Sequence, residues 1–237
     1  MSNGRRGWDV LRWRGLGPFV VLAFREALRP LLYWHAYHIV RNEIFPPVSN
    51  GPPPASGFEI VVRSGDIDCE RIVSQLEGIN NLGAEQIRNR LREGGAVAIA
   101  YAGGRAVGYT WLARRSGELL AFDVGWKVSP REAVYHDAFV VPDYRGRRLP
   151  ARLDAALNDF AYHCGIDCAY ASIALLNSQA HKILGRPGKT HILTLLLLRI
   201  RGINRTWRVA RGASRFEARF VERGLTRPTG QNVKRAG

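Results

Sequence analysis

The segment that most constrains the fold lies past the middle of the chain, at residues 149–164. Its apolar residues recur at spacings of four, four, three and four positions, as Leu149, Leu153, Leu157, Phe160 and Cys164. This spacing predicts a helix with one apolar face, because residues three and four apart share a face. Such a face must be covered, and apolar runs at 133–141 and 169–175 predict strands of the sheet that covers it.

Further apolar runs and helical spacings complete an alternating pattern. They predict strands at 58–63, 96–102, 106–113, 133–141, 169–175 and 190–200, and helices at 67–76, 84–93, 149–164 and 178–184. Gly103 and Gly104 separate two strands, which favours an antiparallel hairpin, whereas the 149–164 helix favours a parallel crossover. The predicted fold class is α/β (α+β), a mixed central sheet flanked by helices.

Composition divides the chain into four parts. Residues 46–57 hold three consecutive prolines, which cannot continue a helix or enter the middle of a sheet, so we interpret this stretch as a linker. It separates a basic aromatic extension, residues 1–45, from a main domain, residues 58–201. Residues 202–237 form a basic C-terminal extension. We expect it to be partly disordered, with room for a last strand or helix.

The N-terminal extension carries seven Arg against three acidic residues, interleaved with aromatic residues. From Phe19 to Ile44 its apolar residues approximate a helical spacing, which Pro30 is expected to break or kink. A basic amphipathic helix rich in aromatic rings suits a membrane surface, because Arg faces anionic lipid while the rings lie among the headgroups. The alternative is an extra helix that packs on the main domain.

The chain as a whole is strongly basic, with 35 Lys and Arg, 20 Asp and Glu, and a formal net charge of +15. It should therefore seek anions such as cofactor phosphates, an anionic membrane or nucleic acid, the last being less favoured. Three cysteines with no C-x2-C pair predict neither a metal site nor a disulfide framework. We expect a cytoplasmic protein, with peripheral contact to the inner face of the membrane as an option. No apolar run approaches the roughly 20 residues of a transmembrane helix.

Residues 135–150 carry the most chemistry. An apolar strand leads into a short loop with Arg145, Arg147 and Arg148, and the loop leads into the N-terminus of the 149–164 helix. The first turn of a helix presents unpaired N–H groups and the positive end of the helix dipole. Together with three arginines, this arrangement predicts a site for a phosphate or pyrophosphate.

These residues resemble a signature of the GNAT superfamily of N-acyltransferases. Val141-Pro142-Asp143-Tyr144-Arg145-Gly146 is similar to the family's V-x-P-x-x-R-G, which leads into x-G-x-G/A and a helix. A second motif begins at Asn177, with a small residue at Ala180 and a glycine at Gly188. The resemblance covers roughly residues 58–201, and the order of elements agrees with it. It implies a mixed GNAT-type sheet and a site for acyl-coenzyme A.

The resemblance also implies roles for individual residues. Backbone groups of Phe139, Val140 and Val141 would pair with the pantetheine arm. The N–H groups of the loop would hold the pyrophosphate, and these belong to Arg145, Gly146, Arg147, Arg148 and Leu149. The Asn177 side chain would contact the cofactor, or would simply cap a helix, as Asn does after many strands.

The sequence departs from the family pattern at three positions. Arg148 and Pro150 stand where small residues are expected, so the backbone would approach a phosphate less closely and one N–H is lost. Charged hydrogen bonds from Arg147 and Arg148 would compensate. Leu184 stands where the family often has a Tyr that protonates the leaving thiolate.

A base that takes the proton of the acceptor amine is the more useful catalytic group. Asp137 is the first candidate, followed by His136 and His181, and each has a structural alternative. Simple strand alternation places Tyr135, Asp137 and Phe139 on one face and His136 on the other, unless a bulge intervenes.

The sequence thus predicts an acyl-CoA-dependent N-acyltransferase, with acetyl transfer to an amine of a small molecule, sugar or lipid precursor. The alternative is a non-catalytic GNAT-like module that recognises anionic lipid or nucleic acid, favoured by the altered loop and the basic C-terminal extension. The acceptor, the acyl chain length, the use of a carrier protein as donor and a homodimeric state are left open.

Overall fold

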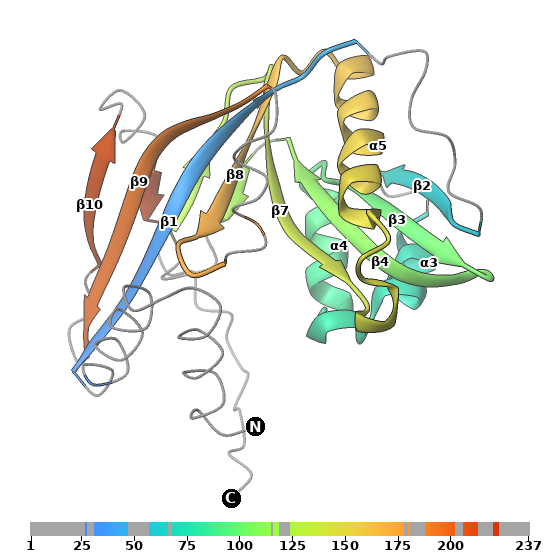
Figure 1. Ribbon diagram of the computed structural model, residues 1–237, viewed down its shortest axis with the longest axis horizontal. Helices are drawn as coiled ribbons and strands as arrows, with labels where there is room; N and C mark the ends of the chain where they lie inside the picture. Colours follow the sequence, from blue (N-terminus) through green and yellow to red (C-terminus); the bar gives the residue numbers. More distant parts are fainter. Residues whose placement is uncertain are drawn as a thin grey trace, which may run out of the picture.

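The computed structural model describes residues 27, 31–46, 57–65, 68–114, 116–118, 124–177, 180, 188–201, 206–212 and 220–222. Its main feature is a mixed sheet with the strand order β10-β9-β1-β8-β7-β4-β3-β2 (Figure 1). These strands are β1 (Leu32–Glu43), β2 (Glu59–Ser64), β3 (Ala96–Ala102), β4 (Arg105–Ala113), β7 (Glu132–Val140), β8 (Cys168–Ala174), β9 (Lys189–Ile200) and β10 (Thr206–Gly212). A small second sheet is formed by β5 (Ser116–Glu118), β6 (Val124–Lys127) and β11 (Phe220–Glu222).

Three helices cover the half of the main sheet that runs from β2 to β7. α5 (Leu149–His163) packs on one face, against the alanines of β3 (Ala96, Ala98 and Ala100). α3 (Cys69–Leu76) and α4 (Ala84–Arg92) pack on the other face, against Val97 and Ile99 of the same strand. Figure 1 shows α5 on the opposite side of this half-sheet from α3 and α4. Because side chains alternate along β3, this strand contributes to the core on each face of the sheet. Small side chains lie under α5, and branched ones lie under α3 and α4.

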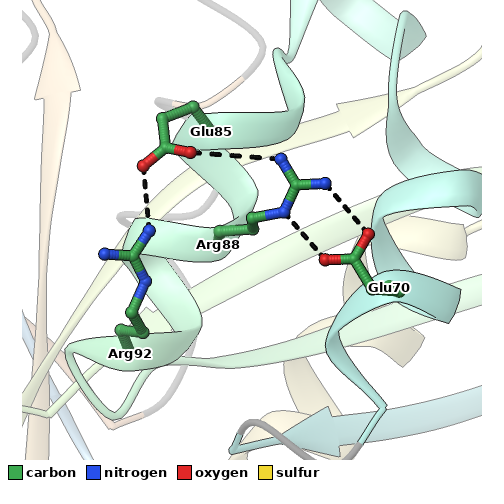
Figure 2. Close-up of polar contacts among 4 residues, drawn as sticks. All are labelled: Glu70, Glu85, Arg88 and Arg92. Carbon is green, nitrogen blue, oxygen red and sulfur yellow. Dashed lines mark hydrogen bonds and ion pairs between the residues drawn. The ribbon is translucent and has the colours of Figure 1, made fainter.

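An ion-pair network at the surface joins α3 to α4 (Figure 2). Arg88 donates two hydrogen bonds to the Glu70 carboxylate, at 2.8 Å from Nε and 2.9 Å from Nη2. Glu85 bridges Arg88 and Arg92, with an Nη2 to Oε1 distance of 2.8 Å for Arg92. These groups are largely exposed, so their role is to fix the helix pair in one orientation rather than to supply much stability. That orientation matters because Arg90, on the same helix, points toward the sheet.

The main sheet includes residues on both sides of the predicted 58–201 domain. β1 lies between β8 and β9 and is antiparallel to both, and β10 pairs with β9 at the edge. The helix predicted over residues 19–44 is therefore wrong for Leu32–Glu43. Its aromatic residues alternate with a period of two, so Tyr37 and Ile39 fill a core on one face. Residues 1–26 and 223–237 lie outside the described part of the chain, as does most of the predicted linker.

The fold class predicted from the sequence is confirmed. Every strand predicted from residue 58 to residue 200 is present, as are the helices near 67–76, 84–93 and 149–164. The Gly103-Gly104 turn joins antiparallel strands, and β7 and β8, which flank α5 in the chain, are parallel. The helix predicted at 178–184 lies outside the described residues except for Ala180. Within the described residues, no helix is long and apolar enough to cross a membrane.

Candidate functional site

The site is built where two parallel strands stop pairing. β7 and β8 are paired only over residues 132–135 and 168–171, which we call the paired end. β7 continues to Val140 and β8 to Ala174 without pairing to each other, and Figure 1 shows them diverging. We call residues 136–140 and 172–174 the open end. Its backbone polar groups need other partners, so the open end suits an extended ligand.

A β-bulge in β7 accompanies the divergence. Opposite the single residue Thr110 of β4, β7 has two residues, Asp137 and Ala138, because Tyr109 pairs with Phe139 and Trp111 with His136. Asp137 takes the left-handed conformation, with φ of 50°. Few residues other than Gly, Asn and Asp adopt this conformation readily. An Asp at this position therefore suits the bulge.

An ion pair holds the bulge in place. Arg90 of α4 donates from Nη1 to Oδ2 of Asp137 at 2.5 Å, and the side chains are only 11% and 17% exposed. The Tyr109 hydroxyl donates to Oδ1 of the same carboxylate at 3.3 Å, and the Arg90 guanidinium lies 5.2 Å from the centroid of the Trp111 ring. Asp137 thus has both oxygens engaged. Its predicted role as a base stays a prediction, while its contacts give it a structural role that the sequence did not indicate.

The bulge changes which residues share a face. His136 and Phe139 both lie on the α3/α4 side, with ring centroids 6.5 Å from Trp111 and 6.2 Å from Tyr109. Tyr135 packs on the α5 side. Simple alternation, which would put Tyr135 and Phe139 on one face, does not hold, because the bulge that the prediction allowed for is present and adds one residue. Burial, reinforced by the nearby Arg90 charge, lowers the pKa of His136 to about 3. His136 is neutral at pH 7 and a weak base.

Of the backbone groups predicted to meet a pantetheine arm, those of Val140 face the open end. The Val141 N–H donates to the Val107 carbonyl at 2.9 Å, so Val141 faces β4. Because backbone groups alternate along a strand, Val140 presents its N–H and carbonyl to the other side. Arg145 Nε donates to that carbonyl at 3.1 Å. Phe139, which is two residues before Val141, faces β4 as well, so of the three only Val140 directs its backbone groups to the open end, and its pairing with a pantetheine arm stays a prediction.

The loop between β7 and α5 carries three exposed arginines that form no ion pair with any described residue. Arg145 also lies 5.9 Å from the Phe139 ring centroid, at the end of β7. Arg147 stacks near two rings, 5.8 Å from the Phe58 centroid and 5.4 Å from the Tyr144 centroid. Among the described residues, no group accepts a hydrogen bond from the backbone N–H of Gly146, Arg147 or Arg148. The loop therefore joins free N–H donors to positive charge, as an anion site requires.

The departures from the family pattern have visible structural consequences. Arg148 is the N-cap residue of α5 and has φ of 58°, a conformation that glycine adopts without strain. Pro150 lies in the first turn of α5, where a missing N–H removes no helical hydrogen bond. Leu149 between them is fully buried and fixes the start of the helix. The loop backbone thus has the left-handed conformation that glycine favours, although the residue at this position is Arg148.

The second motif is only partly within the described structure. The Asn177 Oδ1 accepts a hydrogen bond from the Ala180 N–H at 3.1 Å, so this side chain caps a helical turn. Gly188 has φ of 78°, and a Cβ atom there would lie 3.0 Å from the Phe45 ring. His181 and Leu184 lie outside the described residues, so the third candidate base and the missing Tyr position receive no structural account.

A polar network that the sequence did not indicate seals the paired end. The Tyr135 hydroxyl donates to Oδ1 of Asn158 on α5 at 2.5 Å. Asn42 of β1, which is 8% exposed, donates from Nδ2 to the same oxygen at 3.1 Å. Burial raises the pKa of Tyr135 well above its usual range. The network joins β1, β7 and α5 at Tyr135, which is the last residue of β7 that pairs with β8.

Comparison with protein-family models and with curated protein sequences finds no match. Among solved structures, the chain is similar to a putative acetyltransferase from the GNAT family of Novosphingobium aromaticivorans (TM-score 0.47, 15% identity, 72% of this chain and 65% of that one). It is also similar to a GCN5-related N-acetyltransferase from Kribbella flavida (0.48, 12%, 80% and 65%). A third similar structure is the aminoglycoside N-acetyltransferase AAC(6')-Iy in complex with CoA (0.42, 18%, 56% and 87%).

The chain spans slightly less than two thirds of the length of the first two of these structures. With identities of 12–18% and TM-scores below 0.5, the similarities leave the activity to be argued from the residues of the site.

Proposed function

We propose that this protein is an acyl-CoA-dependent N-acyltransferase. The observation that carries the proposal is the parallel pair β7 and β8, which stops pairing after Tyr135 and Ala171 and has an arginine-rich helix N-terminus at the end of β7. An extended ligand with amide groups and a pyrophosphate at one end suits this arrangement. Coenzyme A has both, and the motif resemblance points to the same ligand.

The donor half of the reaction follows from the contacts. The Val140 N–H would donate to an amide carbonyl of the pantetheine arm, as the neighbouring strand does in a sheet. The N–H groups of Gly146 to Leu149 and the Arg145 guanidinium would bind the pyrophosphate with charge-assisted hydrogen bonds. Binding at both ends would hold the thioester at the open end in one orientation.

The acceptor half needs a neutral amine next to that thioester. Its nitrogen attacks the carbonyl carbon, a C–N bond forms, the C–S bond breaks, and the amine loses a proton while the thiolate leaves. We assign the proton to Asp137, with His181 second, because the low pKa of His136 makes it a weak base. The acceptor class is an amine of a small molecule, sugar or lipid precursor.

Titration calorimetry with acetyl-CoA tests the proposal first. Desulfo-CoA and a long-chain acyl-CoA serve as comparisons, at low and at moderate salt. Saturable binding that persists at moderate salt is expected, and Gly146→Asp and Arg145→Asp should each abolish it. Arg105→Asp makes the same charge change as Arg145→Asp at an exposed hairpin position and should leave binding unchanged. Equal loss in all three variants would contradict a defined site at the loop.

Turnover is tested separately, by the release of free thiol from acetyl-CoA in the presence of a panel of amines. Asp137→Asn keeps the size of the side chain and a partner for Arg90 but removes the charge. Because Asn still accepts a hydrogen bond from Arg90 and adopts the left-handed conformation readily, the bulge should persist; kcat should fall while the affinity for acetyl-CoA stays within about threefold. Full activity of this variant would move the base elsewhere.

The second candidate is a non-catalytic module that binds anionic lipid or nucleic acid. Arg148 and Pro150 in the loop favour it, because both reduce the close approach of backbone to phosphate. Since β10 belongs to the main sheet, a truncation that tests the basic C-terminal residues should begin after Glu222. Loss of vesicle or RNA binding in this truncation, with no acyl-CoA binding by the full chain, would favour the module.

A further inference from the structure

Two histidines and a threonine meet on one face of β1 and β9, beside the open end of β8, where His38 is paired with Ile173. His38 Nδ1 lies 3.1 Å from His191 Nε2 and 3.0 Å from Thr194 Oγ1. His191 Nε2 lies 3.2 Å from the same hydroxyl oxygen. The three atoms thus form a nearly equilateral triangle. His191 is exposed, whereas His38 and Thr194 are partly buried.

A β-bulge brings these residues together. His38 lies directly opposite Thr194, but the register between β1 and β9 shifts between Ile39 and Val40, so that His191 lies opposite Val40. Without the shift His191 would lie opposite Arg41, on the other face of the sheet, because a slip of one residue reverses the face. The bulge therefore turns the His191 imidazole toward His38. Bulges commonly re-aim side chains at functional positions.

Hydrogen bonds alone do not account for the triangle well. A ring N–H lies in the plane of its imidazole and can point directly at one partner only, and the threonine has a single hydroxyl hydrogen. The ring planes meet at 75°. At most two of the three contacts are therefore well-directed hydrogen bonds in any pair of tautomers, and the third has no hydrogen directed along it. A cation in front of the triangle would satisfy all three atoms.

We propose that His38 Nδ1, His191 Nε2 and Thr194 Oγ1 form a site for one divalent transition-metal ion of the Zn²⁺ type. Donors about 2.0–2.1 Å from a tetrahedral zinc ion lie about 3.3 Å from one another, close to the sides of this triangle. Imidazole suits Zn²⁺ and Cu²⁺. The fourth position would hold water. The site has only two residues of the usual ligand types, which agrees with the absence of any cluster of three His, Cys, Asp or Glu among the described residues.

The metal would join distant parts of the chain. His38 and His191 are 153 residues apart in sequence, and β1 is the only N-terminal strand that the described structure places in the sheet. The nearest cation along β9, Lys189, has its Nζ 3.9 Å from Asp154, so its charge is partly offset. A bound ion would tie β1 to β9 and raise the thermal midpoint by mass action.

The test is titration calorimetry of the full chain with ZnCl2, after treatment with EDTA and dialysis and without any acyl-CoA. One equivalent should bind saturably, and CuCl2 should bind more tightly. His38→Gln and His191→Gln should each weaken the affinity at least about 100-fold. Thr194→Val should weaken it about tenfold, the size of effect expected for a supporting ligand. Zinc should raise the thermal midpoint of the wild type and not that of the His variants.

His163→Gln is the matched control, because His163 is an exposed histidine whose Nδ1 lies 2.8 Å from the Asp159 carbonyl oxygen. It should bind zinc like the wild type. Circular dichroism of the metal-free variants shows whether they are still folded. A folded His38→Gln/His191→Gln variant that binds zinc as tightly as the wild type would overturn the proposal, as would a wild type without saturable binding. Neither result bears on acyl-CoA binding.

Discussion

The two ends of the β7–β8 pair differ in what holds them. At the paired end, backbone pairing, the Tyr135 hydroxyl and two asparagines join β7, β8, β1 and α5. At the open end, β7 is held only from its other side, by backbone pairing with β4 and by the ion pair with Arg90 of α4. One strand thus belongs to two structural environments along nine residues.

The comparison shows that the opening needs its own stabilising contacts. A parallel strand that loses its neighbour exposes backbone polar groups, which favours closure or collapse. The bulge and the Arg90–Asp137 ion pair hold residues 136–140 of β7 on the α3/α4 side. The polar network around Asn158 keeps the opening from extending past Tyr135 into the paired end. Changes at either end should therefore have separable effects on stability and on acyl-CoA binding.

The largest effect is expected from Arg90→Ala, which leaves the Asp137 carboxylate without its cation in a mostly buried position. Removal of one partner of such a pair costs about 3–5 kcal/mol of the free energy of unfolding. Affinity for acetyl-CoA should fall as well, because the bulge is no longer held. Urea denaturation and calorimetry measure the two quantities.

Arg88→Ala is the matched control for this variant, two positions earlier on α4. Its ion pairs are at the surface (Figure 2), so it should change stability little and binding not at all. The double variant Arg90→Met/Asp137→Asn removes both charges and should recover most of the stability. If Arg90→Ala and Arg88→Ala behave alike, the ion pair does not hold the bulge.

The pH dependence of stability is the second test of the open end. The pKa of His136 is about 3 in the folded protein and near 6.5 when unfolded. Between these values the unfolded chain binds the additional proton, so the free energy of unfolding falls as the pH falls from about 6.5 toward about 3. The slope attributable to His136 is about 1.4 kcal/mol per pH unit. Denaturation of the wild type and of His136→Gln, at several pH values, measures it by difference.

Above about pH 6.5 the difference between wild type and His136→Gln should be constant, since His136 is then neutral in both states. His163→Gln, at an exposed position, is the control for loss of an imidazole elsewhere in the chain. A His136→Gln variant with an unchanged slope below pH 6.5 would place the imidazole in contact with water rather than beside Trp111.

Most of the central fold was predictable because its signals are local. The spacing of Leu149, Leu153 and Leu157 predicted α5, and the Gly103-Gly104 turn predicted the β3–β4 hairpin. β1 was not predicted, because aromatic residues at positions 33–39 fit both a helical and an alternating pattern. Its place between β8 and β9 depends on pairing with residues more than 120 positions away, which no local pattern encodes.

The sequence predicted where the candidate site lies in the chain, but not how its side chains are arranged. The arginine-rich loop and the end of β7 are where the motif placed them. The bulge at Asp137 was allowed for but not located by the strand pattern, and it reverses the faces of the residues that follow it. The Arg90–Asp137 ion pair and the Asn42–Asn158–Tyr135 network join elements that are separate in sequence, so side-chain chemistry alone did not reveal them.

At the paired end, Tyr135→Phe removes one hydroxyl from the network and should cost about 1–1.5 kcal/mol in the free energy of unfolding. Acetyl-CoA affinity should stay within about twofold of the wild type, because the opening begins beyond this residue. Tyr101→Phe removes a hydroxyl of β3 that donates to Gln75 of α3, and it is the control for loss of a hydrogen bond elsewhere. A much weaker affinity in Tyr135→Phe alone would mean that the two ends are coupled.

The smallest effect is expected at Arg148, where the sequence departs from the family pattern. Arg148→Gly relieves a left-handed backbone, worth about 1–2 kcal/mol, against about 0.5–1 kcal/mol for the greater freedom of glycine when unfolded. A gain of up to about 1.5 kcal/mol in the free energy of unfolding should result. Arg147→Gly, its neighbour, instead loses contacts with the Phe58 and Tyr144 rings and should destabilise.

Acyl-CoA binding by these two variants separates geometry from charge in the loop. If close approach of the backbone limits phosphate binding, Arg148→Gly should bind acetyl-CoA more tightly than the wild type, despite one charge fewer. If charge dominates, both variants should bind more weakly, and the loss should shrink as salt rises. A tighter Arg148→Gly would show that the arginine restricts an otherwise conventional loop. Equal weakening would show that arginines have taken over the role of the missing N–H.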